Sequence, residues 1–295
     1  MPEGLILKGI GGFYQVEGDD GLYECKTRGI FRKKGITPLP GDYVQFTITN
    51  ETLREGWIEE IKERTNYFVR PPVANVKQLA VVMAAACPEP DYLLVDKLLV
   101  SAQKNDIQPF VIINKTDLAD RESLHQMKAN YQAAGFPVIP MSKVTMQGYD
   151  MLHDRLRGSC TVFAGQSGVG KSTILNIIMD KWVMETNTVS EKIQRGRHTT
   201  RHVQLLPLDC RGYVADTPGF SSFSLDGIKY DELAWYYPEF ERVQEACRFH
   251  GCSHINEPGC AVKKAVATGD ISSKRYECYR KIYEELKESY EQRYR

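Results

Sequence analysis

Three short motifs, each typical of guanine-nucleotide sites, occur along this chain in an order that strongly limits its fold. NKTD at residues 114–117 comes first, GQSGVGKS at 165–172 follows it, and DTPG at 216–219 comes last. In an ordinary guanine-nucleotide domain the glycine-rich segment precedes the NKxD segment. The parts of one domain are therefore all present, but the chain enters that domain at a different point, as in a circular permutation.

The segment 165–172 matches the G-x-x-x-x-G-K-[ST] pattern of a phosphate loop at every fixed position. An apolar run at 161–164 precedes it, and apolar residues at helical spacing follow it, so we expect a strand, a loop and a helix. Glycines let backbone N–H groups face a phosphate, and the helix N-terminus adds positive potential. We expect Lys171 to contact the β- and γ-phosphates and Ser172 to bind Mg²⁺. The predicted phosphate-binding residues are Gly165, Gln166, Ser167, Gly168, Val169, Gly170, Lys171, Ser172 and Thr173.

The NKTD segment follows the apolar run 109–113, which is typical of a buried parallel strand. Nucleotides bind at the carboxyl ends of such strands. The carboxylate of Asp117 can accept hydrogen bonds from the N1–H and the exocyclic amine of guanine, whereas adenine has neither donor in that position. Leaving that carboxylate buried and unpaired would cost about 1–3 kcal/mol or more, which favours GTP over ATP. The predicted base-binding residues of this segment are Asn114, Lys115, Thr116 and Asp117.

A second candidate base contact follows the predicted strand 137–140. The segment Met141-Ser142-Lys143 resembles the element that closes over a guanine base, and Ser142 and Lys143 are its candidate contacts. Lys143 stands where alanine is usual. A plain loop is the alternative interpretation.

The DTPG motif ends a further predicted strand. We expect the Asp216 carboxylate to hold Mg²⁺ through a water and the Gly219 N–H to contact the γ-phosphate. The segment 195–201 (RGRHTTR) lies between the phosphate loop and Asp216, in the position of switch I. A threonine there binds Mg²⁺ only while a γ-phosphate is present, and we favour Thr200 over Thr199.

The group that orients the attacking water is not evident at its usual position. Ras-like enzymes carry a glutamine after the glycine of this motif, whereas this chain has Phe220. His198 is the nearest replacement, and a group supplied by a partner is the alternative. Either arrangement predicts slow turnover by the free protein and strong stimulation by the right partner. The predicted catalytic residues are His198, Lys171 and Thr200.

Cys247, Cys252, His254 and Cys260 form the pattern C-x₄-C-x-H-x₅-C. Three thiolates and one imidazole make a closed tetrahedral set for zinc, with no position left open for catalysis. The segment lacks the apolar residues for a core of its own, so metal binding would supply its folding free energy. We therefore expect one structural Zn²⁺, with His250 as the rival ligand to His254.

The pattern of apolar residues divides the chain into three parts. Residues 1–66 contain short alternating stretches separated by turns, which predicts an all-β barrel such as an OB-fold, with an RNA-binding role. Residues 67–224 alternate continuous apolar runs with a helical pattern, which predicts an α/β domain with a mostly parallel sheet. Residues 225–295 hold the cysteine cluster and a long helical stretch from about residue 274, so this part is predicted to be mostly α.

Two surface features have both a structural and an RNA-binding interpretation. The basic cluster of Arg28 and residues 32–34 lies beside Phe31. It is either a solvated loop or an RNA backbone contact with one stacking aromatic ring. The tyrosines between 276 and 283 recur at helical spacing, and a packing stripe is favoured there over an RNA or protein contact.

Composition and the N-terminal segment exclude several classes of protein. The formal net charge is zero, so any nucleic-acid surface must be a local patch. The N-terminal residues lack the pattern of a signal peptide, and the longest apolar run, 79–87, is too short to span a bilayer. We expect a cytoplasmic protein without a membrane partner, whose eight cysteines are thiols or metal ligands rather than disulfides.

Together these motifs resemble the RsgA family, the bacterial GTPases that depend on the small ribosomal subunit. The resemblance covers nearly the whole chain: the barrel, GQSGVGKS, GRHTT, DTPGF and the C-x₄-C-x-H-x₅-C tail. It implies an OB-fold, a circularly permuted GTPase domain and a zinc-binding C-terminal domain. It also implies binding to the small subunit and its rRNA during late maturation, and a role for His198 in GTP hydrolysis. The implied zinc ligands are Cys247, Cys252, His254 and Cys260.

The resulting hypothesis is a Mg²⁺-dependent GTPase that converts GTP to GDP and phosphate with ribosome-stimulated turnover. We expect it to act as a monomer and to have no DNA partner. An RNA-binding assembly factor whose nucleotide site only senses conformation is the first alternative, and a small-molecule kinase is a weaker one. The guanine-specific Asn114 and Asp117 argue against the kinase.

Overall fold

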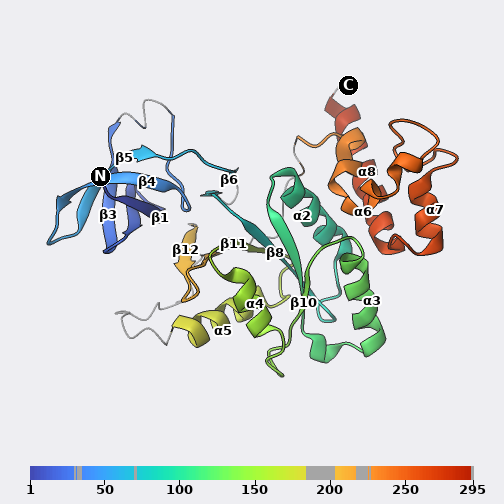
Figure 1. Cartoon of the computed structure of the whole chain (residues 1–295), viewed down its shortest axis with the longest axis horizontal. Helices are drawn as coiled ribbons and strands as arrows, with labels where there is room; N and C mark the ends of the chain where they lie inside the picture. Colours follow the sequence, from blue (N-terminus) through green and yellow to red (C-terminus); the bar gives the residue numbers. More distant parts are fainter. Residues whose placement is uncertain are drawn as a thin grey trace. The chain divides into compact units, whose positions relative to one another are not determined.

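The computed structural model describes residues 1–29, 31, 35–69, 72–183, 203–216, 225 and 227–293 (Figure 1). Its contacts divide the chain into two compact units, each built from segments that are far apart in the sequence. Among the described residues, no helix combines the length and the apolar character needed to cross a membrane. The first unit comprises Met1–Gln78, His153–Phe163 and Asn176–Phe220, and the second comprises Leu79–Leu152, Ala164–Leu175 and Ser221–Arg295.

The N-terminal strands of the first unit close into a barrel. The strand order β1-β2-β3-β5-β4 returns to its start because β1 pairs with both β2 and β4. Alternate side chains point inward, and Ile6, Val16 and Phe46 among them are fully buried. The predicted barrel is therefore confirmed. Its strands are β1 (Glu3–Ile10), β2 (Phe13–Gly18), β3 (Gly21–Thr27), β4 (Tyr43–Asn50) and β5 (Glu55–Ile61).

The aromatic ring next to the basic cluster packs inside the barrel. Phe31 is 7% exposed and belongs to the barrel core. Its ring cannot stack on a base, so this part of the RNA interpretation is wrong: burial of a large apolar ring outweighs its place in a basic connection. Arg28 pairs with Glu59 at 2.6 Å, and residues 32–34 lie outside the described residues.

Strands from the middle of the chain also belong to the first unit. β11 pairs in parallel with β13, and β13 pairs antiparallel with β12. β12 meets the barrel where Gln204 pairs with Lys8, and the Tyr213 hydroxyl donates to Glu17 of β2. The barrel is thus joined to the strands that lead into the phosphate loop and the DTPG motif. These elements are β11 (Cys160–Ala164), β12 (Gln204–Pro207) and β13 (Tyr213–Asp216), with a separate hairpin of β6 (Tyr67–Val69) and β7 (Pro72–Ala74).

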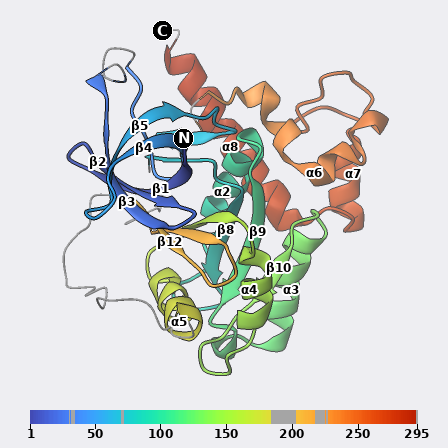
Figure 2. The same ribbon diagram turned by 60° about the vertical axis from the view of Figure 1, so that its left-hand side comes forward.

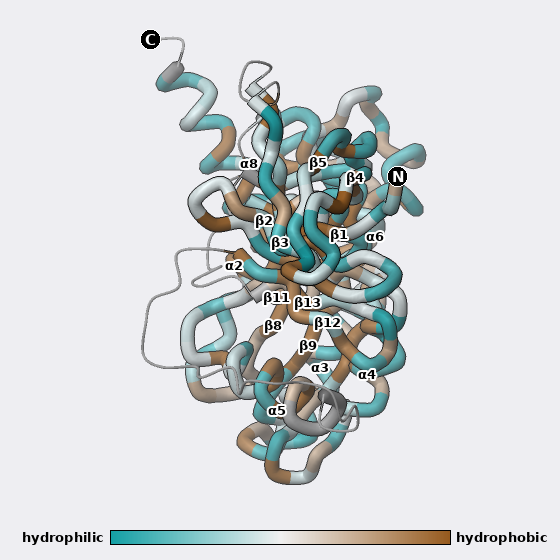
Figure 3. Tube along the Cα trace, turned by 90° about the vertical axis from the view of Figure 1, so that its left-hand side faces the viewer, coloured by the Kyte–Doolittle hydropathy of each residue, from teal (hydrophilic) through white to brown (hydrophobic). Residues whose placement is uncertain are grey.

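The second unit is built on the strands β8, β9 and β10. β10 runs parallel to β9, with Val138 opposite Val111, and every residue of β8 is buried. Such burial on both faces explains the continuous apolar runs in the sequence, which appear brown in Figure 3. Helix α2 begins where the Asp91 side chain accepts a hydrogen bond from the Leu94 N–H at 2.9 Å. The elements here are β8 (Gln78–Ala84), α2 (Tyr92–Lys104), β9 (Gln108–Asn114), η1 (Thr116–Leu118), α3 (Arg121–Gln132) and β10 (Val138–Pro140), while α4 (Tyr149–Leu156) and α5 (Lys171–Val183) each begin in this unit and end in the first.

The C-terminal helices belong to the second unit, where α8 packs on α2 (Figure 2). Arg275 of α8 is 2% exposed and lies between two buried carboxylates. Its Nη1 is 2.7 Å from Asp96 of α2, and its Nε is 2.8 Å from Glu239 of α6. Buried charges are costly unless they are paired, so this group favours one way of packing α8 against α2. The elements are η2 (Tyr230–Tyr236), α6 (Pro238–Glu241), η3 (Gln244–Ala246), α7 (Ala261–Thr268) and α8 (Ser273–Arg293).

The tyrosines at the start of α8 face inward. Tyr279 is almost fully buried, and its hydroxyl donates to the Ser253 carbonyl at 2.7 Å. The Tyr276 hydroxyl donates to the His254 carbonyl at 2.7 Å. The packing interpretation of the tyrosine stripe is confirmed, and the stripe also fastens the segment that carries the predicted zinc ligands.

Candidate functional site

The phosphate loop requires glycine at two positions because neighbouring atoms leave no room for a side chain. Gly165 follows β11 with a φ of +147°, and a Cβ there would lie 2.0 Å from the Val82 carbonyl oxygen. Gly170 precedes α5 with a φ of +101°, and a Cβ there would lie 2.4 Å from Asn114 Nδ2. At Gly165 the clash is with backbone and excludes any side chain, and at Gly170 the clash with the Asn114 amide adds to a φ that favours glycine. The strand–loop–helix arrangement predicted from the motif is confirmed.

Asn114 and Lys115 brace the phosphate loop from the end of β9. The buried Asn114 side chain donates through Nδ2 to the Val169 carbonyl at 2.8 Å. Lys115 adopts a left-handed backbone with a φ of 60°, and its Nζ donates to the Gly168 carbonyl at 2.8 Å and to the Cys87 carbonyl. The sequence assigned both residues to the nucleotide. The structure shows that they also hold the loop, a role that motif spacing does not reveal.

Asp117 is held in an exposed position by a buried hydroxyl. The Ser142 side chain is 1% exposed and donates through Oγ to Asp117 Oδ1. Ser142 Oγ also accepts a hydrogen bond from the Val144 N–H at 3.1 Å, which fixes the loop after β10. Ser142 therefore orients the carboxylate, while Asp117 remains exposed, as a base-reading group must be.

Thr116 and Lys143 occupy contrasting positions beside Asp117. Thr116 is buried, and its N–H and hydroxyl donate to the Met141 carbonyl at 3.1 and 3.2 Å. These bonds join the end of β9 to the end of β10, so Thr116 shapes the turn. Lys143 is exposed, and it lies directly after the Ser142 that holds Asp117.

Lys171 begins α5 and folds back over the phosphate loop. Its Nζ donates to the carbonyls of Gly165 and Gln166 at 2.7 and 2.8 Å. Burial lowers the pKa of Lys171. Both partners are neutral, so a phosphate group would supply the negative charge that this ammonium favours. The neighbouring Ser172, the predicted magnesium-binding residue, is exposed.

The structure describes some of the other residues predicted to bind the nucleotide or Mg²⁺, but not all of them. In the loop, Ser167 and Gly168 are exposed, whereas Val169 is buried, and Thr173 in the first turn of α5 is partly buried. Asp216 ends β13, but its side chain is not described. The predicted residues His198, Thr200 and Gly219 lie outside the described residues.

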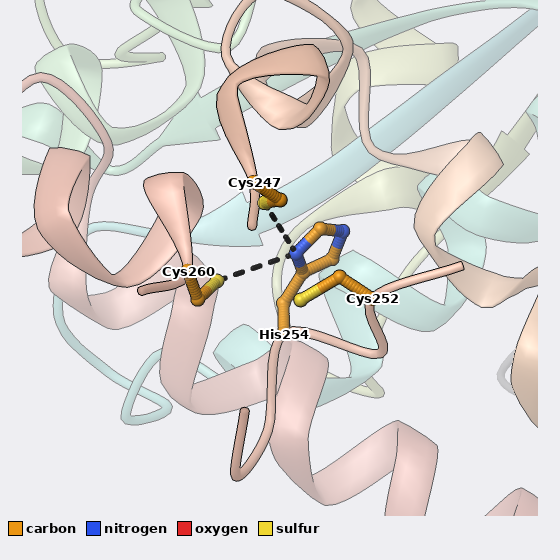
Figure 4. Close-up of side chains that lie close together, drawn as sticks. All are labelled: Cys247, Cys252, His254 and Cys260. Atoms are coloured by element: carbon orange, nitrogen blue, oxygen red, sulfur yellow. Dashed lines mark hydrogen bonds between the residues drawn. The ribbon is translucent and has the colours of Figure 1, made fainter. Parts of the chain in front are cut away.

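The C-terminal segment brings the four predicted zinc ligands together (Figure 4). The sulfurs of Cys247 and Cys260 lie 3.7 and 3.4 Å from His254 Nδ1, and with Cys252 all four donor atoms lie within 4.8 Å of one another. Zinc bonds at tetrahedral angles separate nitrogen and sulfur donors by about 3.6 Å, so this donor set fits zinc. Figure 4 shows the three sulfurs and the ring nitrogen around a common point. His250, the rival ligand, is not among the clustered donors of the described residues.

Residues 247–260, which we call the Cys–His loop, are fastened to α7 by two of these sulfurs. Cys260 Sγ accepts a hydrogen bond from the Lys263 N–H at 3.4 Å and so caps α7. Cys247 Sγ accepts from the Ala261 N–H at 3.3 Å. Hydrogen bonds of this kind also support thiolates that bind a metal.

The protonation of the cluster depends on a cation. Burial, together with the neighbouring thiols, raises the pKa of Cys252 to about 12. Burial lowers the pKa of His254. A bound divalent cation would favour the thiolate forms, since its charge offsets theirs.

The order of the nucleotide-binding motifs in the sequence, and the hydrogen bonds between two of them, define the class of the protein. The NKTD segment precedes the phosphate loop in the sequence, yet hydrogen bonds join the two in one site. A guanine-reading segment, a phosphate loop and a DTPG motif in this order define a circularly permuted GTPase.

Comparison with known proteins places the chain within that class. The RsgA GTPase family matches residues 61–226, and the RsgA N-terminal domain matches residues 3–58. The chain belongs to the RsgA family. It is 52% identical, over 98% of its own length and 95% of the relative, to the small ribosomal subunit biogenesis GTPase RsgA of Ruminiclostridium cellulolyticum. It is 46% identical to the protein of the same name from Geobacillus sp. (strain WCH70), over 98% of each chain.

Two solved structures resemble the whole chain. YloQ, described as a circularly permuted GTPase, is 38% identical with a TM-score of 0.80, over 98% of this chain and 96% of YloQ. YjeQ from Thermotoga maritima is 36% identical with a TM-score of 0.82, over 97% of this chain and 98% of YjeQ. The chain is accordingly a GTP hydrolase, with an N-terminal barrel, a permuted GTPase domain and a C-terminal helical region that holds the cysteine cluster.

Proposed function

We propose that this protein is a monomeric, cytoplasmic GTPase that binds the small ribosomal subunit, acts in its late maturation and hydrolyses GTP with turnover stimulated by that subunit. The observation that carries the proposal is the braced nucleotide site, in which Asn114 and Lys115 bond to Val169 and Gly168. The partner is suggested by relatives that align over nearly their whole length and are named for small ribosomal subunit biogenesis.

Within this site we assign the binding of GTP, GDP and Mg²⁺ to the motif residues. Asp117, oriented by Ser142, reads the guanine base. Lys171 neutralises phosphate charge, since its present partners are neutral carbonyls. Ser172 and Thr200 bind Mg²⁺ in the GTP state. Asp216 holds Mg²⁺ through a water, and the backbone N–H of Gly219 contacts the γ-phosphate.

The decisive test of this function is GTP turnover by the purified protein with and without purified small subunits. Stimulation of at least about tenfold is expected, because activated GTPases gain as much as about 10⁵-fold from their partners. Large subunits are the matched control and should leave the rate unchanged. Equal turnover with and without small subunits would overturn the proposal and favour a nucleotide-sensing assembly factor.

We propose that His198 positions the attacking water. His198→Ala should remove most of the stimulated turnover and leave GTP affinity nearly unchanged, because the histidine acts on the water and not on the nucleotide. His125→Ala, on the exposed surface of α3, is the matched control. Wild-type stimulated turnover in His198→Ala would assign the water to a group of the ribosome instead.

We propose that Cys247, Cys252, His254 and Cys260 hold one structural Zn²⁺. The donor spacing supports this set, and its four protein ligands leave no open position. Metal analysis after treatment with a mild chelator should find about one equivalent of zinc. Zinc-free protein that folds like the zinc-loaded protein would contradict the assignment.

We propose that the barrel contacts rRNA through a different aromatic ring from the one expected. Phe13 is 44% exposed, Lys26 Nζ lies 4.8 Å from its ring centre, and Lys8 and Arg54 line the same hollow of about 400 Å³. Exposed rings beside cations are typical of single-stranded RNA contacts, worth about 1–3 kcal/mol per stacked base. Phe13→Ala should weaken small-subunit binding about tenfold or more, whereas Tyr43→Ala, outside the hollow, should not. Equal affinities of the two variants would remove Phe13 from the interface.

A further inference from the structure

A second group of metal-ligand side chains lies in the first unit, at the turn between β12 and β13. His153 of α4 and two residues of this turn, Asp209 and Cys210, place a ring nitrogen, a carboxylate oxygen and a sulfur within 4.8 Å of one another. His153 Nε2 is 3.0 Å from Asp209 Oδ1. The side chains of His153 and Asp209 are 20% and 23% exposed. The group is therefore held by the fold and is still accessible to solvent.

Backbone contacts hold the turn that carries Asp209 and Cys210 against the end of α4. The Leu208 N–H donates to the Gly212 carbonyl at 2.8 Å, and the Gly158 N–H donates to the Cys210 carbonyl at 3.2 Å. A Cβ on Gly212 would lie 2.2 Å from the Leu156 carbonyl oxygen, so the turn packs directly on the end of α4. The turn and the helix that carry the three donors are thus locked together.

The donor atoms match the preferences of a borderline divalent cation. Imidazole nitrogen, thiolate sulfur and carboxylate oxygen are the three donor types of zinc sites. Zinc bonds at tetrahedral angles place nitrogen and oxygen donors about 3.4 Å apart, so the observed 3.0 Å requires a shift of only a few tenths of an ångström. We propose that His153, Asp209 and Cys210 form a second metal site of the zinc class, with its fourth position open to water.

The charges of the group support a divalent ion. A thiolate and a carboxylate together carry two negative charges, which a divalent cation offsets while the neutral imidazole binds as the third ligand. The nearby Arg157 pairs with Asp154 at 3.1 Å, so part of its charge is already offset. This second site has three ligands at a partly exposed surface, and it should release metal more readily than the Cys–His loop.

A filled site would join two segments that lead to the nucleotide site. α4 precedes β11, which runs into the phosphate loop, and the turn precedes β13, which ends at Asp216. A metal bound to both would stabilise the first unit by an amount that grows with the logarithm of metal concentration over Kd, so the thermal midpoint should rise by about 2–4 °C when free metal is several times its Kd. The inference concerns metal binding alone, so it stands or falls independently of any ribosomal partner.

The test is metal uptake by the full-length protein whose chelator-resistant zinc is already bound. Titration with Co²⁺ should load about one further equivalent and produce a near-ultraviolet sulfur-to-cobalt absorption band. Cys210→Ser should abolish the band, and His153→Ala should weaken Co²⁺ binding at least about tenfold. Cys87→Ser, which removes an exposed thiol outside the group, is the matched control and should behave like wild type.

Asp209→Asn provides a variant that preserves the shape of the turn. It keeps an oxygen that can accept from His153 but removes the negative charge, so Co²⁺ affinity should fall while the thermal midpoint of the metal-free protein stays unchanged. Equal Co²⁺ uptake by wild type, Cys210→Ser and Asp209→Asn would overturn the proposal. The three residues would then be a surface hydrogen bond beside a thiol.

Discussion

The phosphate loop and the Cys–His loop both hold irregular backbone in place, but they do so by different means. The phosphate loop is held by the protein's own atoms, since Gly165 lies against the Val82 carbonyl and Asn114 bonds to Val169. In the Cys–His loop three sulfurs and one imidazole converge on a point where a cation fits. We therefore expect the first loop to keep its shape without its ligand and the second to gain folding free energy from a bound metal.

This difference predicts opposite responses to the loss of a ligand. A nucleotide site that is built into a sheet should keep its shape when empty. A cluster of buried thiols should lose its shape without a metal, because its thiolates then have no counter-charge. The two loops lie in the same compact unit, so the comparison can be made within one molecule.

The largest expected effect is that of removing one of the proposed zinc ligands. Structural zinc supplies about 10 kcal/mol of apparent folding free energy in small zinc domains. Cys252→Ser should therefore expose the backbone amides of residues 247–268 to hydrogen exchange and leave GTP affinity within about twofold of wild type. Cys87→Ser is the matched control. A parallel loss of GTP binding in Cys252→Ser would show that the two loops fold as one cooperative element.

A smaller but still large effect is expected at the buried charges that join α8 to α2. Arg275→Met should lower the free energy of unfolding by about 3–5 kcal/mol, because Asp96 and Glu239 would be left buried without their partner. Urea denaturation measures this change. Arg280→Met is the control on the same helix. Arg280 is half exposed, and its ion pair with Glu284 is long, at 3.9 Å, so it should contribute little to stability. Equal losses in the two variants would contradict the structural role of Arg275.

The third effect tests whether the phosphate loop depends on close backbone packing. Gly165→Ala should cost about 3 kcal/mol and abolish measurable GTP binding, because its Cβ would overlap the Val82 carbonyl. Gly168 also has a positive φ, of +80°, but a Cβ there would have its nearest contact at 3.9 Å, so only about 1–2 kcal/mol of backbone strain is expected for Gly168→Ala. In both variants, calorimetric titration with GDP measures the loss of nucleotide affinity, and thermal unfolding measures the loss of stability. Similar costs at the two positions would mean that strain alone, without the close contact, limits the loop.

The smallest effect concerns the orientation of Asp117. Ser142→Ala removes a hydrogen bond worth about 0.5–1.5 kcal/mol, so GDP affinity should fall by about twofold to tenfold. Lys143→Ala, which restores the residue usual at that position, should change affinity by less than about twofold, because Lys143 is exposed. A larger loss in Lys143→Ala than in Ser142→Ala would assign the base contact to the lysine side chain.

Sequence reasoning succeeded where the signal is local and chemical. The phosphate loop, the strands around it and the clustering of three cysteines with His254 were predicted from residue types that only a few structures tolerate, as the clash at Gly165 illustrates. The expectation failed at Phe31, which lies beside basic residues in the sequence but packs in the barrel core. The assignments of His198 and Thr200 remain predictions, as they lie outside the described residues.

The sequence by itself determined the class of nucleotide, the permuted order of the motifs and the ligand chemistry of the cysteine cluster, because each depends on residue types at short spacing. Only the tertiary structure decided which residues hold the motifs and the C-terminal helices in place. Asn114 meets Val169 across 55 residues, Ser142 meets Asp117 across 25, and Arg275 meets Glu239 across 36. Partners this far apart are set by strand order and helix packing, and no local pattern encodes them. The turn that places Asp209 and Cys210 beside His153 has the same origin, since the chain joins these donors only by packing the turn on α4.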